Sequence, residues 1–334
     1  MRKFTLIFIA VCSVFNSSAQ TITKIAFGSC GHQNANQDIL YKVTDKKPDI
    51  FIYLGDNIYG DTKNMELLQK KYDKLGNKAP HQNLRENTKV LAIWDDHDYG
   101  KNDAGKEYPK KEESKAIFLD FWEEPDSSTR YNHEGIYHAE YYGSGDSIVQ
   151  VILLDTRTFR DRLKKSKKGY KHAYMPTDNK KSTFLGEEQW LWLEEELQNP
   201  ATIRIIASSN QFAHEYNGYE SWTNMPHEQQ KMLDIIERTQ ANGVVFISGD
   251  VHWGELSKME TENTYPIYDM TSSGLTQEWR FIETNINRID EAVAENNFGL
   301  IEINWAEQFL TLNLYDINDS LRIEHAISFD EIEF

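Results

Sequence analysis

The sequence has few cysteines, few positive charges and no apolar run long enough to cross a bilayer. Its 334 residues include two cysteines, Cys12 and Cys30, so a fold held together by several disulfides is excluded. Asp and Glu number 53 against 36 Lys and Arg, and the resulting formal charge of −17 opposes sequence-independent binding to DNA or RNA. We therefore expect no nucleic-acid partner, and an anionic substrate would need locally placed positive charge.

Proline and glycine are also sparse, at 8 and 18 residues, whereas aromatic residues make up 12% of the chain. This composition excludes a fibrous or wholly disordered chain and is typical of a packed globular protein. The sequence after the first 19 residues has no repeat, low-complexity tract or Pro/Ser-rich linker. We expect a single domain from residue 20 to residue 334.

The segment 1–19 has the features of a cleaved signal peptide. Basic residues at its start precede an apolar run at 4–15, and the small residues Ser17-Ser18-Ala19 end it. The apolar run is too short for a permanent membrane span, so we expect an exported, periplasmic or secreted protein without a transmembrane anchor in its mature chain. The less favoured alternative is a lipoprotein acylated at Cys12.

Apolar, β-branched runs typical of buried strands alternate with amphipathic helical patterns along most of the chain. The predicted strands are Ile22–Phe27, Ile50–Leu54, Val90–Ile93, Val149–Leu154, Ile203–Ala207 and Val244–Ile247. The predicted helices are Asn64–Leu75, Lys111–Trp122, Leu185–Leu197 and Glu228–Thr239. This alternation favours an α/β fold with a largely parallel sheet. Three tail segments, Gly299–Asn304, Phe309–Tyr315 and Leu321–Ile327, are expected to be antiparallel strands that complete a second sheet.

Polar residues follow each predicted strand directly, and the carboxyl edge of a parallel sheet would bring them together. The strings are Gly28-Ser29-Cys30, Gly55-Asp56-Asn57-Ile58-Tyr59, Trp94-Asp95-Asp96-His97-Asp98, Asp155-Thr156-Arg157, Ser208-Ser209-Asn210-Gln211 and Ser248-Gly249-Asp250-Val251-His252-Trp253. Carboxylates, imidazoles, a thiol and a phenol together suit metals of different softness. Each residue alone also has an ordinary structural explanation, since an Asp can cap a helix and Cys30, Tyr59 or His252 can be a core residue.

Taken together with Phe27 and Thr271-Ser272-Ser273-Gly274-Leu275-Thr276, these strings resemble the alkaline phosphatase D (PhoD-like) family of metallophosphatases. This family belongs to the calcineurin-like and purple acid phosphatase group, and the resemblance covers nearly all of the mature chain. It implies a four-layer α/β/β/α sandwich, phosphoester hydrolysis and a mixed site with ferric iron and calcium. The β-rich amino-terminal domain of longer bacterial members has no counterpart here, which leaves the substrate class open.

The resemblance also implies a role for each of these residues. Iron would be held by Cys30, Asp56, Tyr59 and His252, and Asp56 would bridge to a second metal held by Asp96, Asp250 and, unless it only shapes the pocket, Asn210. A ferric ion can deprotonate a phenol, whereas carboxylate and amide oxygens favour Ca²⁺, with Mg²⁺ or Mn²⁺ as alternatives. His97 would donate a proton or hydrogen bond to the phosphoryl or leaving oxygen, with Asp98 orienting its ring.

Three further features have more than one interpretation. Arg157 is a candidate phosphate-binding fork or a structural ion-pair partner of Asp155 or Asp161. His214 would either ligate a metal or only shape the pocket. The segment 160–172 contains seven Lys or Arg residues and is either a solvated loop or an overhang that attracts polyanionic substrates or anionic lipid headgroups.

We therefore expect an exported, metal-dependent phosphoester hydrolase in which an activated hydroxide attacks phosphorus in line. Its expected partner is a small phosphoester, with phosphodiesters favoured at least as much as monoesters and a phospholipid headgroup as a further candidate. The alternatives are a phospholipase C-like or nucleotide-cleaving phosphodiesterase and, outside enzymes, a surface binding protein stabilised by its metals. His97 favours an enzyme, because the two-metal scheme does not need it as a ligand.

Overall fold

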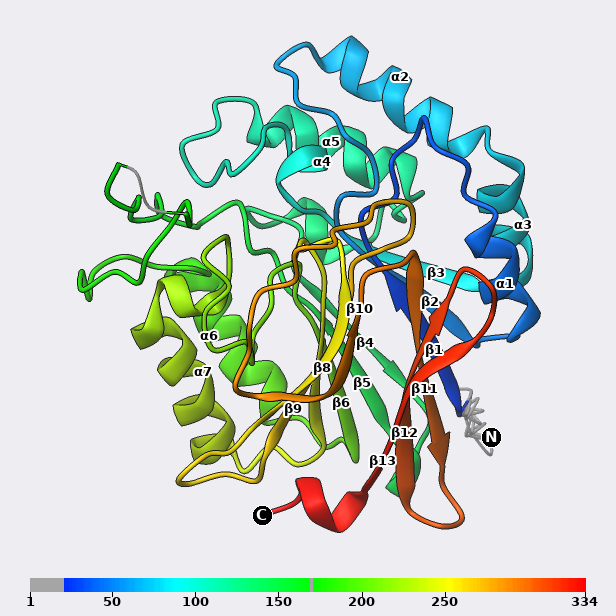
Figure 1. Cartoon of the computed structure of the whole chain (residues 1–334), viewed down its shortest axis with the longest axis vertical. Coiled ribbons are helices and arrows are strands. Elements are labelled where there is room, and N and C mark those ends of the chain that lie inside the picture. The colour runs from blue at the N-terminus through cyan, green and yellow to red at the C-terminus, as the bar shows by residue number, and fades with distance from the viewer. Residues whose placement is uncertain (1–20, 169–170) are drawn as a thin grey trace, which may run out of the picture.

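The computed structural model describes residues 21–168 and 171–334, which form two sheets packed face to face with helices on both outer sides (Figure 1). This is the expected α/β fold with four layers in the order α/β/β/α. The signal peptide predicted at 1–19 lies outside the described residues. Within the described ranges, no helix is both long and apolar enough to cross a membrane.

The first sheet has six strands in the order β13-β12-β11-β1-β2-β3. Their bounds are β1 Lys24–Gly28, β2 Ile50–Leu54, β3 Lys89–Ile93, β11 Asn297–Asn304, β12 Phe309–Asp316 and β13 Leu321–Ser328. β1, β2 and β3 are parallel, whereas β11 pairs antiparallel with β1, Leu300 lying opposite Ala26. The antiparallel tail was predicted, but its place in a separate second sheet was wrong. Local hydrophobic patterns identify a strand but do not show which distant strand it will pair with.

The second sheet has seven strands in the order β10-β8-β9-β7-β6-β5-β4. Their bounds are β4 His138–Tyr142, β5 Val149–Leu153, β6 Ile203–Ala207, β7 Val244–Ser248, β8 Gly254–Met259, β9 Ile267–Ser272 and β10 Arg288–Val293. β5, β6, β7 and β9 are parallel. The six predicted strands of the main α/β pattern are therefore divided between two sheets. The other strands of this sheet, β4, β8, β9 and β10, carry more polar residues and were not predicted.

The helices cover the outer faces of the two sheets. Their bounds are α1 Ile39–Asp45, α2 Met65–Gly76, α3 Ala79–Asn87, α4 Asp96–Tyr99, α5 Lys111–Phe121, α6 Gly186–Leu197 and α7 Pro226–Thr239, with 3₁₀ turns at Thr129–Tyr131, Gly145–Ser147, Trp222–Asn224 and Phe329–Ile332. α1 to α5 lie on the side of β1, β2 and β3, and α6 and α7 lie outside the second sheet (Figure 1). The four predicted helices are confirmed as α2, α5, α6 and α7.

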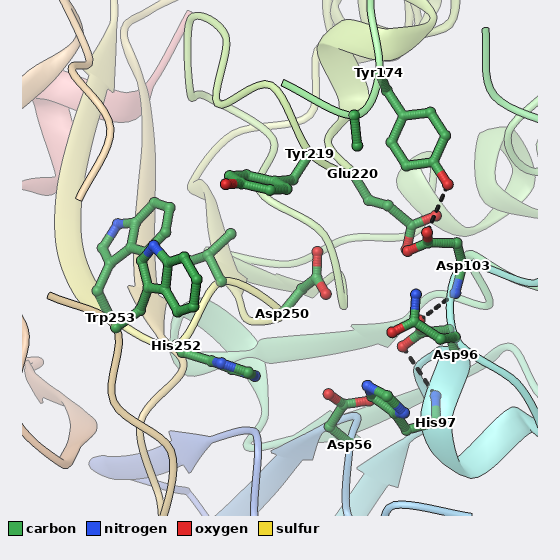
Figure 2. Close-up of a pocket in the computed structure, with 14 residues that line it drawn as sticks. Asp56, Asp96, His97, Asp103, Tyr174, Tyr219, Glu220, Asp250, His252 and Trp253 are labelled. Atoms are coloured by element: carbon green, nitrogen blue, oxygen red, sulfur yellow. Dashed lines mark hydrogen bonds between the residues drawn. The ribbon is translucent and has the colours of Figure 1, made fainter. Parts of the chain in front are cut away.

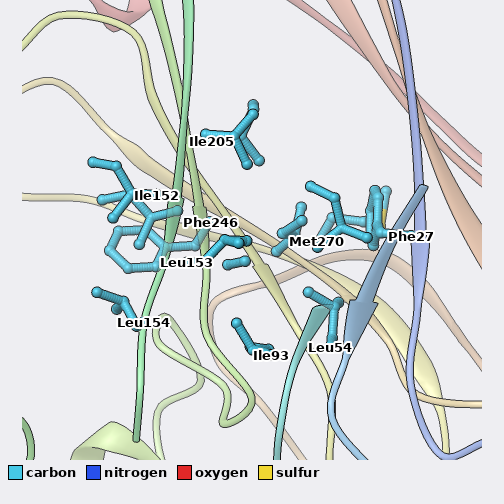
Figure 3. Packing of buried hydrophobic residues seen from close by; sticks show 14 of the residues in the cluster. Phe27, Leu54, Ile93, Ile152, Leu153, Leu154, Ile205, Phe246 and Met270 are labelled. Carbon is cyan, nitrogen blue, oxygen red and sulfur yellow. The ribbon is translucent and has the colours of Figure 1, made fainter. Parts of the chain in front are cut away.

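The core lies between the sheets, where apolar side chains from both meet (Figure 3). Phe27, Leu54 and Ile93 of the first sheet and Phe246 and Met270 of the second are all inaccessible to solvent. Burial on both faces explains why these strands read as continuous apolar runs rather than alternating patterns. Because the packed core fixes the two sheets against each other, the carboxyl ends of their parallel strands are held at one place.

Candidate metal centre and active site

Loops at the carboxyl ends of strands from both sheets surround one pocket of about 410 Å³. Figure 2 shows its acidic and imidazole side chains gathered around the cavity. Asp56 follows β2, Asp96 and His97 follow β3, and Asp250 and His252 follow β7. The convergence of polar strand ends that the sequence predicted is therefore present.

The four residues expected to hold iron lie together. Cys30 Sγ is 3.6 Å from Asp56 Oδ2, and Tyr59 Oη is 3.1 Å from His252 Nε2. The ligand atoms of Cys30, Asp56 and His252 all lie within 4.8 Å of one another. These residues come from three strand ends and from both sheets, so only the complete fold assembles them.

Four of the predicted metal ligands have backbone angles that non-glycine residues rarely adopt. The values of φ are 61° at Cys30, 50° at Asp56, 75° at Asp250 and 65° at His252. Ser273 helps to hold two of them, because its Oγ accepts a hydrogen bond of 2.8 Å from the His252 N–H and lies 3.2 Å from Cys30 Sγ. Such conformations cost free energy and persist where the surrounding structure imposes them, which supports a functional role for this cluster.

The electrostatics of the cluster fit a cation. Burial, and then the neighbouring Cys30 and Asp96, raises the pKa of Asp56 well above its usual range. Burial also raises the pKa of the Cys30 thiol to about 12 and lowers that of His252 to about 4, which keeps the imidazole neutral as metal ligation requires. Asp56 Oδ1 and Asn210 Oδ1 are buried without a hydrogen-bond partner among the described residues. A bound cation would satisfy these oxygens and favour the charged forms.

The residues expected at the second metal lie on the other side of Asp56. Asp96 joins Asp56 and His97 in one potential metal-binding cluster, and Asp95 and Asp250 in another. Asn210 Nδ2 donates a hydrogen bond of 3.3 Å to Asp250, which leaves its Oδ1 available. Asp103 and Glu220 also have ligand atoms within 4.8 Å of that of Asp96, although neither was predicted. Neither directly follows a strand end, so the pattern that indicated the other candidate ligands could not identify them.

His97 is oriented by Asp61, which the sequence analysis missed. The His97 Nδ1 to Asp61 Oδ2 distance is 2.7 Å, and the Gly60 N–H donates to the His97 carbonyl at 3.0 Å. Burial alone would lower the pKa of His97, but Asp61 and then Asp96 outweigh it and raise the pKa to about 9. The histidine is therefore protonated at neutral pH in the metal-free protein.

Asp98 does not have the orienting contact that was expected of it. Its Oδ1 accepts from the Asp95 N–H at 2.6 Å, and its Oδ2 accepts from Asn57 Nδ2 at 2.5 Å. The first bond is part of the capping box of α4, and the second connects this turn to the loop after β2. Asp98 thus fixes the turn that carries Asp96 and His97, and the ring contact belongs to Asp61.

Arg157 is fully buried and forms ion pairs with two buried carboxylates. Its Nε donates to Asp95 Oδ1 at 2.6 Å, and its Nη1 lies 2.6 Å from Glu220 Oε2. Of the two interpretations, the geometry favours the ion pair, although its partners differ from the Asp155 and Asp161 that were predicted. Asp155 instead accepts from the Arg157 backbone N–H at 2.9 Å. The guanidinium therefore positions the loops behind the pocket.

His214 lies in a buried polar network rather than in a metal cluster. Its Nε2 is 3.6 Å from Glu255 Oε1, and its Nδ1 accepts from the Tyr216 N–H at 3.1 Å. Of its two interpretations, shaping the surroundings of the pocket fits this position.

The model of the PhoD-like phosphatase family matches residues 69–299 of the chain. The chain belongs to the PhoD-like phosphatase family. Alkaline phosphatase D of Bacillus subtilis is 24% identical over 283 residues, which cover 72% of this PhoD-like chain and 48% of that protein. The chain therefore spans about half the length of the curated relative it matches.

Solved structures share the fold of this PhoD-like chain. The structure of PhoD matches with a TM-score of 0.72 at 17% identity and covers 93% of this chain and 72% of its own. GAP50, the anchor in the inner membrane complex of Plasmodium, matches with a TM-score of 0.61 at 10% identity over 92% of this chain and 89% of its own. A dimetal phosphatase from Danio rerio gives 0.54 at 11% identity over 93% of this chain and 100% of its own.

The family match and the site overlap only in part. The matched interval contains Asp96, His97, Arg157, Asn210, Asp250 and His252, whereas Cys30, Asp56 and Tyr59 precede it. The three earlier residues reach the PhoD-like site because β1 and β2 pair beside β3 in the first sheet.

Replacing Arg157 should destabilise the protein strongly. Arg157→Met would leave Asp95 as an uncompensated buried charge and would remove one of the two arginine partners of Glu220, so we expect the free energy of unfolding to fall by about 3–5 kcal/mol. Chemical denaturation monitored by tryptophan fluorescence measures this. Arg162→Met, at an exposed residue nearby, is the matched control and should change the same quantity by less than about 0.5 kcal/mol. Equal stabilities of the two variants would contradict the positioning role.

Proposed function

We propose that this chain hydrolyses phosphoesters, accepting phosphodiesters as well as monoesters. The observation that carries the proposal is the convergence of buried metal-ligand candidates from both sheets on one pocket beside an oriented histidine, in a chain of the PhoD-like phosphatase family. Metal ions bound there would supply Lewis acidity and a hydroxide nucleophile. The name of the curated relative, alkaline phosphatase D, agrees with this reaction class.

We propose Fe³⁺ and Ca²⁺ as the metals, with Mg²⁺ or Mn²⁺ as alternatives at the second position. Cys30, Tyr59 and His252 offer thiolate, phenolate and imidazole donors, a set that suits ferric iron. Asp96, Asp250 and Asn210 offer only oxygen donors on the facing side, which suits a hard divalent cation. The Asp56 carboxylate lies between the two sets and would be shared.

His97 would act as the general acid. Its side chain is 17% exposed and lines the pocket, so it can reach a phosphoester bound there. Its Nδ1 is occupied by Asp61, which leaves Nε2 to protonate the leaving oxygen or donate a hydrogen bond to the phosphoryl group. Asp98 and Arg157 would serve as positioning residues, because both are buried behind the loop that presents the histidine.

The main alternatives differ in leaving group or in class. A nucleotide-cleaving or phospholipase C-like activity would use the same pocket with a different substrate. A surface protein that binds metals only for stability would need no His97, and the bond between Asp61 and His97 would then have no evident purpose. Turnover by the His97 variant described below separates the enzyme from this non-enzymatic alternative.

We propose that the protein is exported with 1–19 as a cleaved signal peptide, leaving a mature chain from residue 20 to 334. The basic start, the apolar run and the small residues before the cleavage point support this proposal. The intact mass of protein recovered from its native host tests it. A lipid attached to Cys12 would show the lipoprotein alternative to be correct.

Wild-type protein should hydrolyse a chromogenic phosphodiester, and His97→Ala should lower kcat by roughly 10²–10⁴-fold, which is the contribution of one acid–base group. Metal content should be unchanged, because His97 is not assigned as a ligand. Asp56→Asn should instead lose metal and activity together, since the shared carboxylate serves both positions. His325→Ala on β13 is the matched control. An active, unaltered His97→Ala enzyme would contradict this role.

Iron bound through Tyr59 should give the protein visible colour, because phenolate and thiolate donors to Fe³⁺ produce charge-transfer absorption. Tyr59→Phe should remove the phenolate part of the band while the ring preserves packing. Metal analysis and visible spectra of the same samples measure this, with Tyr41→Phe on α1 as the matched control. Fully active, colourless protein without iron would overturn the assignment and favour a pair of Ca²⁺, Mg²⁺, Mn²⁺ or Zn²⁺ ions.

Asp61→Asn should shift the pH dependence of kcat. Since the Asp61 carboxylate raises the pKa of His97, its neutralisation should lower that pKa, and the protonated acid should be lost at lower pH. We expect the alkaline limb of the pH–kcat profile to move to lower pH and kcat at pH 8 to fall about tenfold or more. Glu66→Gln, at an exposed position of α2, is the control. An unchanged profile would show that Asp61 does not govern His97.

A further inference from the structure

Two segments form one part of the rim of the pocket. We call residues 275–287, between β9 and β10, the apolar loop, and the described residues 160–168 and 171–172 the basic segment. Trp279 of the apolar loop lines the pocket, as do Ala173 and Tyr174, which directly follow the basic segment. Whatever approaches the site from this side therefore meets both segments.

The apolar loop exposes large hydrophobic side chains to solvent. Phe281 and Ile286 are each 78% exposed, more than any other large hydrophobic residue in the described ranges, and Trp279 is 41% exposed. The rings of Trp279 and Phe281 lie 6.4 Å apart. Single exposed apolar residues are common on proteins, but a group of them beside a ligand pocket indicates a surface that meets something apolar.

The apolar loop is anchored by hydrogen bonds near both of its ends. The Trp279 N–H donates to the His252 carbonyl at 2.9 Å, which connects the loop directly to a candidate metal ligand. Asn285 Nδ2 donates to Ser257 Oγ at 2.8 Å. Because polar contacts fix both ends of the loop, its apolar side chains are held outward while alternatives that bury them are disfavoured.

Positive charge gathers next to these apolar side chains. Lys171 Nζ is 2.7 Å from Glu283 Oε1, so the basic segment is joined to the apolar loop. The exposed cations of the two segments are Arg162, Lys165, Lys167, Lys168, Lys171 and Arg280. In a chain of formal charge −17, this is a local departure from the overall sign. Apolar and cationic side chains thus share one rim.

We propose that this rim docks the pocket onto an anionic lipid surface, so that phosphoesters carried by lipid headgroups are a substrate class of the site. The proposal rests on the phosphoester hydrolase function and deepens it. Aromatic and aliphatic side chains insert at the boundary between headgroups and acyl chains, while Lys and Arg attract anionic headgroups. The docked pocket would then open toward the headgroup phosphates.

The chemistry of the rim distinguishes this occupant from two others. A soluble polyanion would be bound by the cations but would gain nothing from the exposed Phe281 and Ile286. A stable protein partner would need roughly 800 Å² of surface on each side, far more than three exposed apolar side chains provide. A lipid surface uses both the apolar and the cationic component.

The test measures binding of the purified full chain to sedimented vesicles. One set contains phosphatidylcholine alone and the other contains phosphatidylcholine with phosphatidylglycerol. Wild-type protein should bind the anionic vesicles more tightly, and added salt should weaken this binding. The double variant Phe281→Ser/Ile286→Ser should lower the partition coefficient about tenfold or more, since it removes two exposed apolar side chains.

Further variants separate the two components of the rim. Lys167→Gln/Lys168→Gln/Arg280→Gln should weaken binding to anionic vesicles without creating a preference for neutral ones. Leu191→Ser on α6, at a residue that is 58% exposed, and Lys231→Gln on α7 are the matched controls and should bind like wild type. All variants should turn over a saturating concentration of a soluble chromogenic phosphodiester with the wild-type kcat, because none alters a residue of the site.

Each contrary outcome has a distinct meaning. Wild-type protein that ignores anionic vesicles but hydrolyses the soluble diester would overturn docking and leave the hydrolase function intact. Apolar variants that bind like wild type, while the cation variant does not, would overturn lipid insertion and indicate a soluble polyanion. Vesicle binding without hydrolysis of either the soluble diester or the lipid phosphoester would overturn the substrate class together with the proposed function.

Discussion

The balance of buried negative charge at the seam between the two sheets is the constraint on which the structure depends. Asp56, Asp95, Asp96 and Asp250 lie buried or nearly so around one cavity. Arg157 compensates Asp95 through a direct ion pair, but no described cation makes such a pair with Asp56 or Asp250. Carboxylates in a site of low polarity must either take up protons or hold cations. The fold therefore provides internal counter-ions for Asp95 and Glu220 and leaves Asp56 and Asp250 for external ones.

The sandwich can hold buried carboxylates and strained residues at its strand ends because its core resists distortion. The loops that follow buried strands contain four residues with φ between 50° and 75°, namely Cys30, Asp56, Asp250 and His252. The sheets interlock through Phe27, so relaxing one loop would disturb packing across the seam (Figure 3). Strain and like-charge repulsion at the strand ends are thus opposed by the hydrophobic free energy of the layers beneath them.

Local signals in the sequence identified most of the strands and most residues of the candidate site, but contacts between distant segments were beyond them. Cys30, Asp56, Tyr59 and His252 could be found because each follows an apolar run that reads as a strand or lies in the turn after it. Asp61 could not, since its contact with His97 joins positions 36 residues apart and depends on how two loops cross. The pairing of β11 with β1 could not be predicted for the same reason, because the pairing of distant strands does not appear in the hydrophobic periodicity of either segment.

Both the net charge of the chain and the acidic side chains of the pocket oppose the approach of an anionic phosphoester. An acidic chain with an acidic cavity repels anions at long range, so attraction must come from cations within the site and around its mouth. The first would be the metals held between Asp56 and its neighbours, and the second is the basic segment, joined to the apolar loop through Glu283. Because screening limits the reach of Lys and Arg to about 8–10 Å at ordinary salt, the basic segment acts on molecules already near the rim. Apolar contact through Phe281 is not screened by salt, so under this proposal the two components together would hold an anionic, amphiphilic surface at the pocket more strongly than either alone.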